Sequence, residues 1–258
     1  RLRLILRRLA ETEQLARATR PDMIVTIDSP GFCFRLGKRL KDAGIPLVHY
    51  VAPTVWAWKP GRARKIAQFL DHLLVLLPFE PPYFEAEGLD CTFVGHSAVS
   101  HAKGDGAAFR ARHGLSAEAT VLGLLPGSRQ GEVSRLLPTF IETVEHLSRN
   151  VADLAVVVPA VDHVADTIRQ QFAASHLQPV IVGSDEKSDA LASQDGALAA
   201  SGTVTLELTL AGVPTVAAYR MHPLTMAIVR RMTRVNSVSL TNLILEDSII
   251  PEYLQEAC

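Results

Sequence analysis

The sequence predicts an α/β protein with doubly wound parallel sheets. Short β-branched and apolar runs recur along the 258 residues, and segments with helical periodicity lie between them. Most of these runs are near-continuous rather than alternating, which is typical of strands that helices cover on both faces. Strands that alternate with helices at this spacing indicate βαβ units and parallel sheets.

Nine runs are expected to be strands. They cover residues 23–27, 47–51, 73–77, 92–94, 121–125, 154–158, 180–182, 197–200 and 213–217. The clearest helical patterns cover residues 34–43, 62–69, 133–147 and 161–174. In the third helical pattern, apolar side chains three and four residues apart form one face, and Pro138 is expected to kink this helix or displace its start.

The chain is long enough for two domains. Residues 101–116 carry three glycines and many charges, and strand-like segments lie on either side. We therefore expect a first domain over residues 1–100, a link over 101–116 and a second domain over 117–258. Each sheet would then have a crevice at the carboxyl ends of its strands, where ligands bind in such folds.

The composition excludes several classes of protein. With 48% hydrophobic and 21% charged residues, the chain is neither disordered nor fibrous. Its three cysteines are far apart and have no metal-ligand spacing, and no apolar run is long enough to span a bilayer. The net charge of −1 argues against a wholesale nucleic-acid binder, but residues 1–70 carry +9 and residues 71–258 carry −10.

The first eight residues combine arginines with leucine and isoleucine, and a helical pattern continues to residue 19. The arginines are Arg1, Arg3, Arg7 and Arg8. A basic amphipathic element on an anionic membrane has this pattern. A surface helix whose leucines enter a core while its arginines stay in water has it too.

Both tryptophans, Trp56 and Trp58, fall in one loop that precedes four basic residues between 59 and 65. Aromatic rings beside cations can contact a sugar or a membrane interface. They can also simply cover the edge of a sheet.

Asp28 is the first candidate for chemistry. A strand at residues 23–27 brings it to a carboxyl end, and Ser-Pro-Gly and a helix follow. A carboxylate at this position can act as a general base. It can equally cap the helix or form an Asx-turn without any catalytic role.

A later strand ends in Pro126 and a turn formed by Gly127, Ser128 and Arg129. Backbone N–H groups, a hydroxyl and a helix dipole converge there beside a guanidinium, which suits a phosphate. The segment has neither the Walker nor the dinucleotide glycine pattern. A structural turn with a surface arginine is the alternative.

A second turn of this kind is formed by Ser201, Gly202 and Thr203 at the start of another expected helix. Glu207 lies one helical turn beyond Thr203, where a carboxylate can accept two hydrogen bonds from a ribose diol. An ordinary acid favoured by the helix dipole is the alternative.

Several segments together resemble the lipid-A-disaccharide synthase family in order and spacing, over nearly the whole chain. They are IDSPGF, the long segment from GIPLVHY through VWAW and PFEPPYFE to FVGH, LLPGSRQGEV, SGTVTLEL, YRMHP and VSLTNLI. The resemblance implies a GT-B fold of two Rossmann-like domains with parallel sheets that face a central cleft, and a mechanism without metal or cofactor.

The implied reaction is an inverting transfer. It moves 2,3-diacylglucosamine from its UDP donor to 2,3-diacylglucosamine 1-phosphate, which forms the β-1,6 disaccharide of lipid A and releases UDP. The implied partners are these two substrates and an anionic membrane surface, without nucleic acid. The implied location is cytoplasmic, on the cytoplasmic face of the inner membrane.

The family's functional residues carry over where its motifs match. Asp28 matches an essential acid that is a candidate base toward the acceptor 6-hydroxyl, and Arg129 matches an arginine at the donor diphosphate. Gly31 stands where many members have a second Asp. The remaining matches concern the nucleotide and are Ser201, Gly202, Thr203, Glu207 and Asn242.

Two other functions stay open at this point. One is another UDP-sugar enzyme of GT-B type such as an epimerase, and the other is a nucleotide-binding homologue without turnover. The VWAW and PFEPPYFE segments argue against the epimerase. Because the chain opens without Met and lacks the family's amino-terminal Gly-rich segment and carboxyl-terminal helices, we expect a fragment that is inactive by itself.

Overall fold

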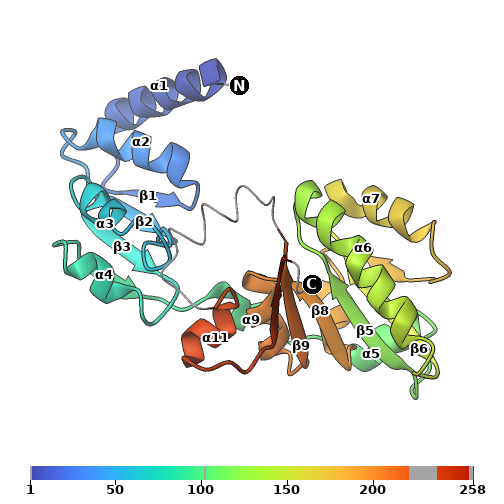
Figure 1. Ribbon diagram of the computed structural model, residues 1–258. Coiled ribbons are helices and arrows are strands. Elements are labelled where there is room, and N and C mark those ends of the chain that lie inside the picture. Colours follow the sequence, from blue (N-terminus) through green and yellow to red (C-terminus); the bar gives the residue numbers. More distant parts are fainter. Residues whose placement is uncertain (1, 102, 221–236, 256–257) are drawn as a thin grey trace. The chain divides into compact units, whose positions relative to one another are not determined.

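The computed structural model (Figure 1) describes residues 2–101, 103–220, 237–255 and 258. The chain forms two compact units, and the boundary between them falls between His96 and Ser97. Each unit contains one sheet, and every strand pair in both sheets is parallel. The predicted α/β class with parallel sheets is therefore confirmed.

The first unit contains a four-stranded sheet in the order β1-β2-β3-β4. Its elements are α1 (Leu2–Thr19), β1 (Ile24–Ile27), α2 (Pro30–Leu40), β2 (Leu47–Tyr50), α3 (Gly61–Ile66), β3 (His72–Val75), α4 (Pro81–Glu85) and β4 (Cys91–Phe93). Since successive strands are neighbours and such crossovers are right-handed, α2, α3 and α4 cover the same face of the sheet. Leu36, Leu40, Leu73 and Phe84 belong to the core on that face.

The edge strand β1 departs from the expectation that both faces are covered. Ile24 packs against the core of the first unit, whereas Val25 and Ile27 point to the other face and are 53% and 64% exposed. The apolar run at 23–27 is therefore a half-exposed strand in the described part of this unit. A β-branched run does not by itself distinguish one buried face from two.

The second unit contains a six-stranded sheet in the order β10-β9-β8-β5-β6-β7. Its elements are η1 (Ser97–His101), α5 (Gly106–Arg112), β5 (Thr120–Leu125), α6 (Gln130–Leu147), β6 (Leu154–Pro159), α7 (Asp162–Phe172), β7 (Val180–Val182), α8 (Lys187–Ala192), β8 (Gly196–Ala200), α9 (Thr203–Leu210), β9 (Thr215–Tyr219), α11 (Leu240–Leu245) and β10 (Glu252–Leu254). All nine expected runs form strands, eight of them with shifted ends, and β10 is an additional strand in the described residues.

Helix α6 supplies much of the core of the second unit. Val133, Leu137 and Phe140 belong to one hydrophobic core with Leu124 of β5, and they lie on the apolar face that the periodicity predicted. Pro138 lies inside the helix, which runs from Gln130 to Leu147 around it. Of the two expected effects of Pro138, the displaced start is excluded, because the helix begins at Gln130 and its buried apolar face continues on both sides of the proline.

Residues 103–116, which fall in the expected link, pack within the second unit. Arg110 of α5 donates to the carbonyl of Ser193 at 2.8 Å and forms an ion pair with Asp195 at 2.8 Å. A Cβ on Gly106 would lie 2.2 Å from the carbonyl oxygen of Ala192, so this close approach of two backbones requires glycine. Gly104 and Gly106 thus serve the packing of this segment against the second unit.

Candidate functional site

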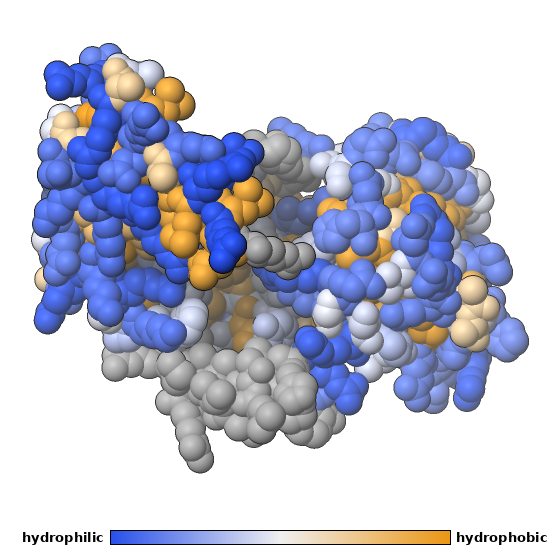
Figure 2. All heavy atoms as spheres, turned by 90° about the horizontal axis from the view of Figure 1, so that it is seen from above, coloured by the Kyte–Doolittle hydropathy of each residue, from blue (hydrophilic) through white to orange (hydrophobic). Residues whose placement is uncertain are grey.

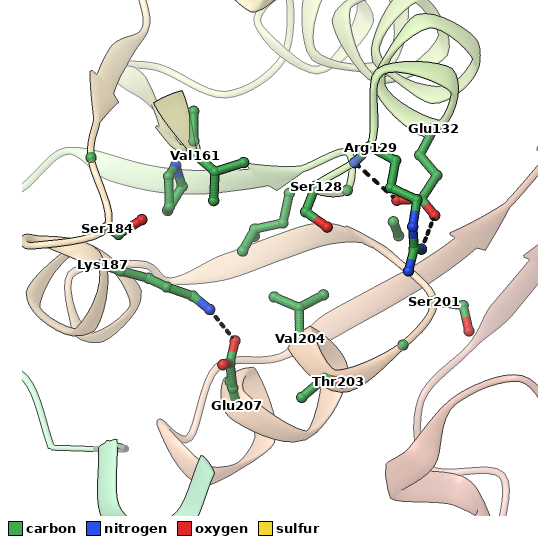
Figure 3. Close-up of a pocket in the computed structure, with 17 residues that line it drawn as sticks. Ser128, Arg129, Glu132, Val161, Ser184, Lys187, Ser201, Thr203, Val204 and Glu207 are labelled. Carbon is green, nitrogen blue, oxygen red and sulfur yellow. Dashed lines mark hydrogen bonds and ion pairs between the residues drawn. The ribbon is translucent and has the colours of Figure 1, made fainter. Parts of the chain in front are cut away.

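A pocket of about 440 Å³ lies at the carboxyl ends of β5, β6, β7 and β8, within the second unit (Figure 3). Ligands bind at this edge in open parallel sheets. Each strand contributes the turn that follows it. The residues that line the pocket are Leu125, Gly127, Ser128, Arg129, Glu132, Pro159, Ala160, Val161, Gly183, Ser184, Lys187, Ala200, Ser201, Gly202, Thr203, Val204 and Glu207. The two turns predicted from the sequence therefore share one cavity with Glu207.

The turn after β5 has the geometry of an anion site. Gly127 has φ +110, and a Cβ there would lie 2.6 Å from Oε2 of Glu132, so the turn excludes other residues. Arg129 is the N-cap of α6, and the Ser128 carbonyl accepts a hydrogen bond from Nε2 of His163 at 2.8 Å. The amino terminus of an 18-residue helix thus opens into the pocket beside a hydroxyl and a guanidinium.

Glu132 holds the guanidinium of Arg129. Nη1 of Arg129 lies 2.6 Å from Oε1 of Glu132, and the backbone N–H of Arg129 donates to Oε2 at 3.3 Å. The hydrogen bond between the guanidinium and the Glu132 carboxylate raises the pKa of Arg129, whose side chain is 79% exposed. Sequence reasoning missed Glu132, because its N-cap is Arg129 and the Ser or Thr that marks a capping box in a sequence is absent.

The turn after β8 contributes Ser201, Gly202 and the first residue of α9, Thr203. The hydroxyl of Ser201 donates to the carbonyl of Val238, so its proton is already used and its oxygen can only accept from a ligand. Thr203 and the backbone at the start of α9 are the remaining donors of this turn toward an anion.

Glu207 lies one turn further along α9, on the pocket side (Figure 3). Its Oε2 is buried and lies 2.6 Å from Nζ of Lys187, at the start of α8. Lys187 was missed by sequence reasoning. The only signal for it is its place after the strand at 180–182, because α8 is too short to show a pattern.

Asn242 is not among the residues that line this pocket. It is 5% exposed on α11, where its Nδ2 donates to the carbonyl of Ile250 at 2.8 Å and to Glu252 at 3.0 Å. Its Oδ1 accepts from the backbone N–H of Ile250 at 2.8 Å. In this structure the side chain joins α11 to the segment that leads into β10.

Asp28 follows β1 in the first unit and is exposed. It has φ +47 and Ser29 has φ +46, so two successive non-glycine residues adopt the left-handed conformation, which costs free energy. The N-cap of α2 is Ser29, and no side-chain hydrogen bond caps this helix. The capping alternative for Asp28 therefore has no support in the geometry, and the turn presents its carboxylate to solvent.

Buried His49 lies on the strand next to β1. Its Nδ1 is 2.7 Å from the hydroxyl of Thr26. Burial lowers the pKa of His49, and the negative charge of Asp28 acts in the opposite direction. The net effect of the buried site is to favour the neutral imidazole.

The two tryptophans have different environments. Trp56 is 8% exposed, and its indole N–H donates to the buried carboxylate of Glu80 at 3.2 Å. Trp58 is 36% exposed, and the ammonium of Lys59 lies 4.3 Å from the centre of its ring. Trp56 is thus a core side chain, and only Trp58 presents a ring to solvent beside cations.

Helix α1 exposes apolar and basic side chains together. Leu2 is 63% and Leu4 is 54% exposed, and the only buried residue of the helix is Leu9. Arg3, Arg7 and Arg8 are exposed beside them, whereas Arg1 lies outside the described residues. On the first unit, Figure 2 shows hydrophobic and hydrophilic side chains next to one another. The alternative in which the helix inserts its leucines into a core holds for Leu9 alone.

Among the described residues, no group of three or more His, Cys, Asp and Glu side chains is arranged to hold a metal ion. No helix in the described ranges is long and apolar enough to cross a membrane.

The fold and the pocket define a class: an α/β protein of parallel sheets with a pocket at the carboxyl ends of its strands, beside the starts of two helices. The family model for lipid-A-disaccharide synthetase matches residues 1–258, and the chain belongs to this family. The lipid-A-disaccharide synthase of Rhodospirillum centenum is 54% identical over 263 residues, which covers 100% of this chain and 66% of that protein. The chain thus spans slightly less than two thirds of the length of this relative.

Solved structures with much lower identity share the fold. The UDP-GlcNAc 2-epimerase of Methanocaldococcus jannaschii has a TM-score of 0.59 at 12% identity, over 97% of this chain and 70% of that chain. MurG of Acinetobacter baumannii has a TM-score of 0.52 at 14% identity, over 98% and 66%. These likenesses show the predicted GT-B type of fold.

Proposed function

We propose that this chain serves the reaction of lipid-A-disaccharide synthase. The reaction moves 2,3-diacylglucosamine from its UDP donor to the 6-hydroxyl of 2,3-diacylglucosamine 1-phosphate and releases UDP. The single observation that carries the proposal is the pocket of the second unit, where two helix amino termini, a guanidinium and Glu207 meet in a member of this family.

Each group has a role that follows from its chemistry. Backbone N–H groups at the starts of α6 and α9, with Arg129, stabilise the negative charge that develops on departing UDP. Glu207 accepts hydrogen bonds from the ribose hydroxyls. Because Glu132 holds Arg129 in this structure, the diphosphate has to compete with this carboxylate for the guanidinium.

An inverting transfer also needs a base that removes the proton of the acceptor hydroxyl. We assign this role to Asp28, which the strained turn after β1 exposes without a capping function. Asp28 belongs to the first unit and the nucleotide pocket to the second. In this account, acceptor activation and donor binding are therefore divided between the units.

The membrane surface is proposed as a further partner, through α1. Its exposed leucines can enter the interface while Arg3, Arg7 and Arg8 contact anionic head groups. This would place the protein on the cytoplasmic face of the inner membrane, where both acylated sugars can reach it.

The experiment is an assay of UDP release from the acylated UDP-sugar, with and without the acylated acceptor, on the full-length protein. Release that depends on the acceptor supports the proposal. UDP binding without such release would favour a nucleotide-binding homologue without turnover. Conversion of the donor sugar at C2 without acceptor would favour an epimerase.

A further inference from the structure

The pocket contains a charge that neither the sequence motifs nor the assigned roles account for, the ammonium of Lys187. Its side chain is 38% exposed and reaches from the start of α8 to Glu207 on α9 (Figure 3). The Nζ to Oε2 distance is 2.6 Å. The pair thus joins the turn after β7 to the helix after β8, across one end of the cavity.

Two other charged side chains near Lys187, those of Glu186 and Asp189, are directed toward α5. Asp189 pairs with Arg112 at 2.7 Å, and Glu186 pairs with the same guanidinium at 3.2 Å. Both acids therefore connect α8 with α5. Lys187 is the charged side chain of this helix that lines the pocket.

The lining of the pocket is balanced in charge. Its two carboxylates, Glu132 and Glu207, are each paired with one cation, Arg129 and Lys187. An unpaired carboxylate in the pocket would lower the affinity for a diphosphate, because like charges repel strongly where water is partly excluded. Lys187 removes this repulsion from the end of the pocket that holds Glu207.

The pairing also fixes which carboxylate oxygen meets a ligand. Oε2 of Glu207 is buried against the ammonium, and Oε1 is the oxygen left to accept hydrogen bonds. A carboxylate held at one oxygen loses the freedom to rotate about its terminal torsion, so less conformational entropy is lost when a hydroxyl binds. Partly exposed ion pairs contribute little to folding stability, which favours a role in binding.

We propose that Lys187 is a positioning residue, which holds Glu207 so that the pocket recognises the ribose hydroxyls of a nucleoside diphosphate. The inference rests on the proposed function, since it requires that UDP binds in this pocket. It adds that selection of a ribonucleotide over a deoxyribonucleotide depends on Lys187 together with Glu207.

The test compares binding of UDP with binding of 2′-deoxy-UDP and 3′-deoxy-UDP by titration calorimetry. A hydrogen bond to a charged acceptor predicts that the unmodified protein binds UDP about tenfold or more tightly than the weaker of the two deoxy analogues. The Lys187→Met variant should bind UDP more weakly than the unmodified protein does, with an affinity close to that for the weaker deoxy analogue. Its affinity for that deoxy analogue should change much less. Lys187→Arg should restore most of the discrimination, because it keeps the cation.

Two further variants complete the design. Arg169→Met removes a surface ion pair, that with Asp166 at 2.9 Å, outside the pocket lining and should leave the discrimination unchanged. In the double variant Lys187→Met with Glu207→Gln, the discrimination should be no lower than in Glu207→Gln alone, since both residues act through one carboxylate.

The possible failures are distinguishable. If UDP does not bind to the unmodified protein, the proposed function fails. If UDP binds but Lys187→Met keeps the ratio of the UDP and deoxy-UDP affinities, or weakens all three ligands equally, the positioning role is overturned. An equal loss would mean that Lys187 acts on the diphosphate charge or on the fold of α8 instead.

Discussion

Arg129 and Glu132 form the charged pair at the turn after β5, and the diphosphate assignment depends on this pair. For Arg129→Ala we expect UDP binding about 10-fold to 100-fold weaker, because charge-assisted hydrogen bonds to phosphate are lost. Titration calorimetry measures the change, and Arg169→Ala is a matched control on α7. Unaltered UDP affinity in Arg129→Ala would contradict the diphosphate role.

Asp28 is the residue on which the assignment of a base depends. Asp28→Asn keeps the size of the side chain but cannot take a proton, so turnover should fall by about 100-fold or more while UDP affinity persists. Steady-state kinetics of the full-length protein provide the measurement. Asp22→Asn, an exposed acid ahead of the same strand, is the control. Unchanged kinetics in Asp28→Asn would remove Asp28 from the mechanism.

At the scale of single residues, the sequence predicts positions better than contacts. Gly127, Arg129 and Glu207 could be placed in one site because strand ends and turn chemistry are local signals. The partners Lys187 and Glu132 escaped because pairing across turns is a tertiary property. For Asn242, the family motif predicted a place near the donor site. In the structure, its amide instead donates hydrogen bonds to the carbonyl of Ile250 and to Glu252.

Among the elements, the loop around Trp56 is held by one buried acid. Glu80 is 3% exposed and accepts hydrogen bonds from the indole of Trp56 and from the backbone N–H groups of Leu76 and Leu77. Burial raises the pKa of Glu80 above its ordinary value of 4.5, although these donors act in the opposite direction. The positions of the loop around Trp56 and of the segment that leads into α4 thus depend on the carboxyl group of Glu80, which can gain or lose a proton.

This pKa shift predicts how stability changes with pH. A folded-state pKa above the unfolded value means that the contribution of Glu80 is fully present below pH 4.5 and is lost as the pH rises through the raised pKa. Urea unfolding as a function of pH should show a steeper loss of stability above pH 4.5 in the unmodified protein than in Glu80→Gln. Glu85→Gln, an exposed acid on α4, should keep the original slope. Equal slopes in all three proteins would show that Glu80 titrates normally.

Most strands could be predicted from the sequence, and the features that were missed have physical explanations. All nine expected strands are present, and most of them are buried parallel strands, which leave near-continuous apolar runs. Strand β10 was not expected, since its three residues, Glu252–Leu254, owe their extended form to pairing with β9. The exposure of Val25 and Ile27 was missed because hydrophobicity does not tell which faces of a sheet are covered.

Along the whole chain, the charge is divided between two segments of unequal length. Residues 1–70 carry a net charge of +9 and residues 71–258 carry −10. On the proposed function, the basic segment contains the element that meets anionic lipids and the acidic segment contains the nucleotide pocket. The cations of that pocket, Arg129 and Lys187, are each paired with a carboxylate.

This division predicts the membrane behaviour of the protein. Replacing Arg3, Arg7 and Arg8 by Gln should weaken binding to vesicles of phosphatidylcholine with phosphatidylglycerol by about 100-fold at low salt, at about 1 kcal/mol for each basic residue. Co-sedimentation measures the binding. Replacing the exposed Arg35, Lys38 and Lys41 by Gln changes the net charge equally, within the same unit. If both triple variants lose the same affinity, net charge rather than α1 controls membrane binding.

If the pocket of the second unit serves a transfer between two acylated glucosamines, UDP and disaccharide 1-phosphate must form together. Mass spectrometry measures the stoichiometry of the two products after the full-length protein is mixed with both substrates. We expect one β-1,6 disaccharide for each UDP released, and loss of both products in Asp28→Asn. UDP release without a disaccharide, or disaccharide formation that is unaffected in Asp28→Asn and Arg129→Ala, would contradict the proposed transfer.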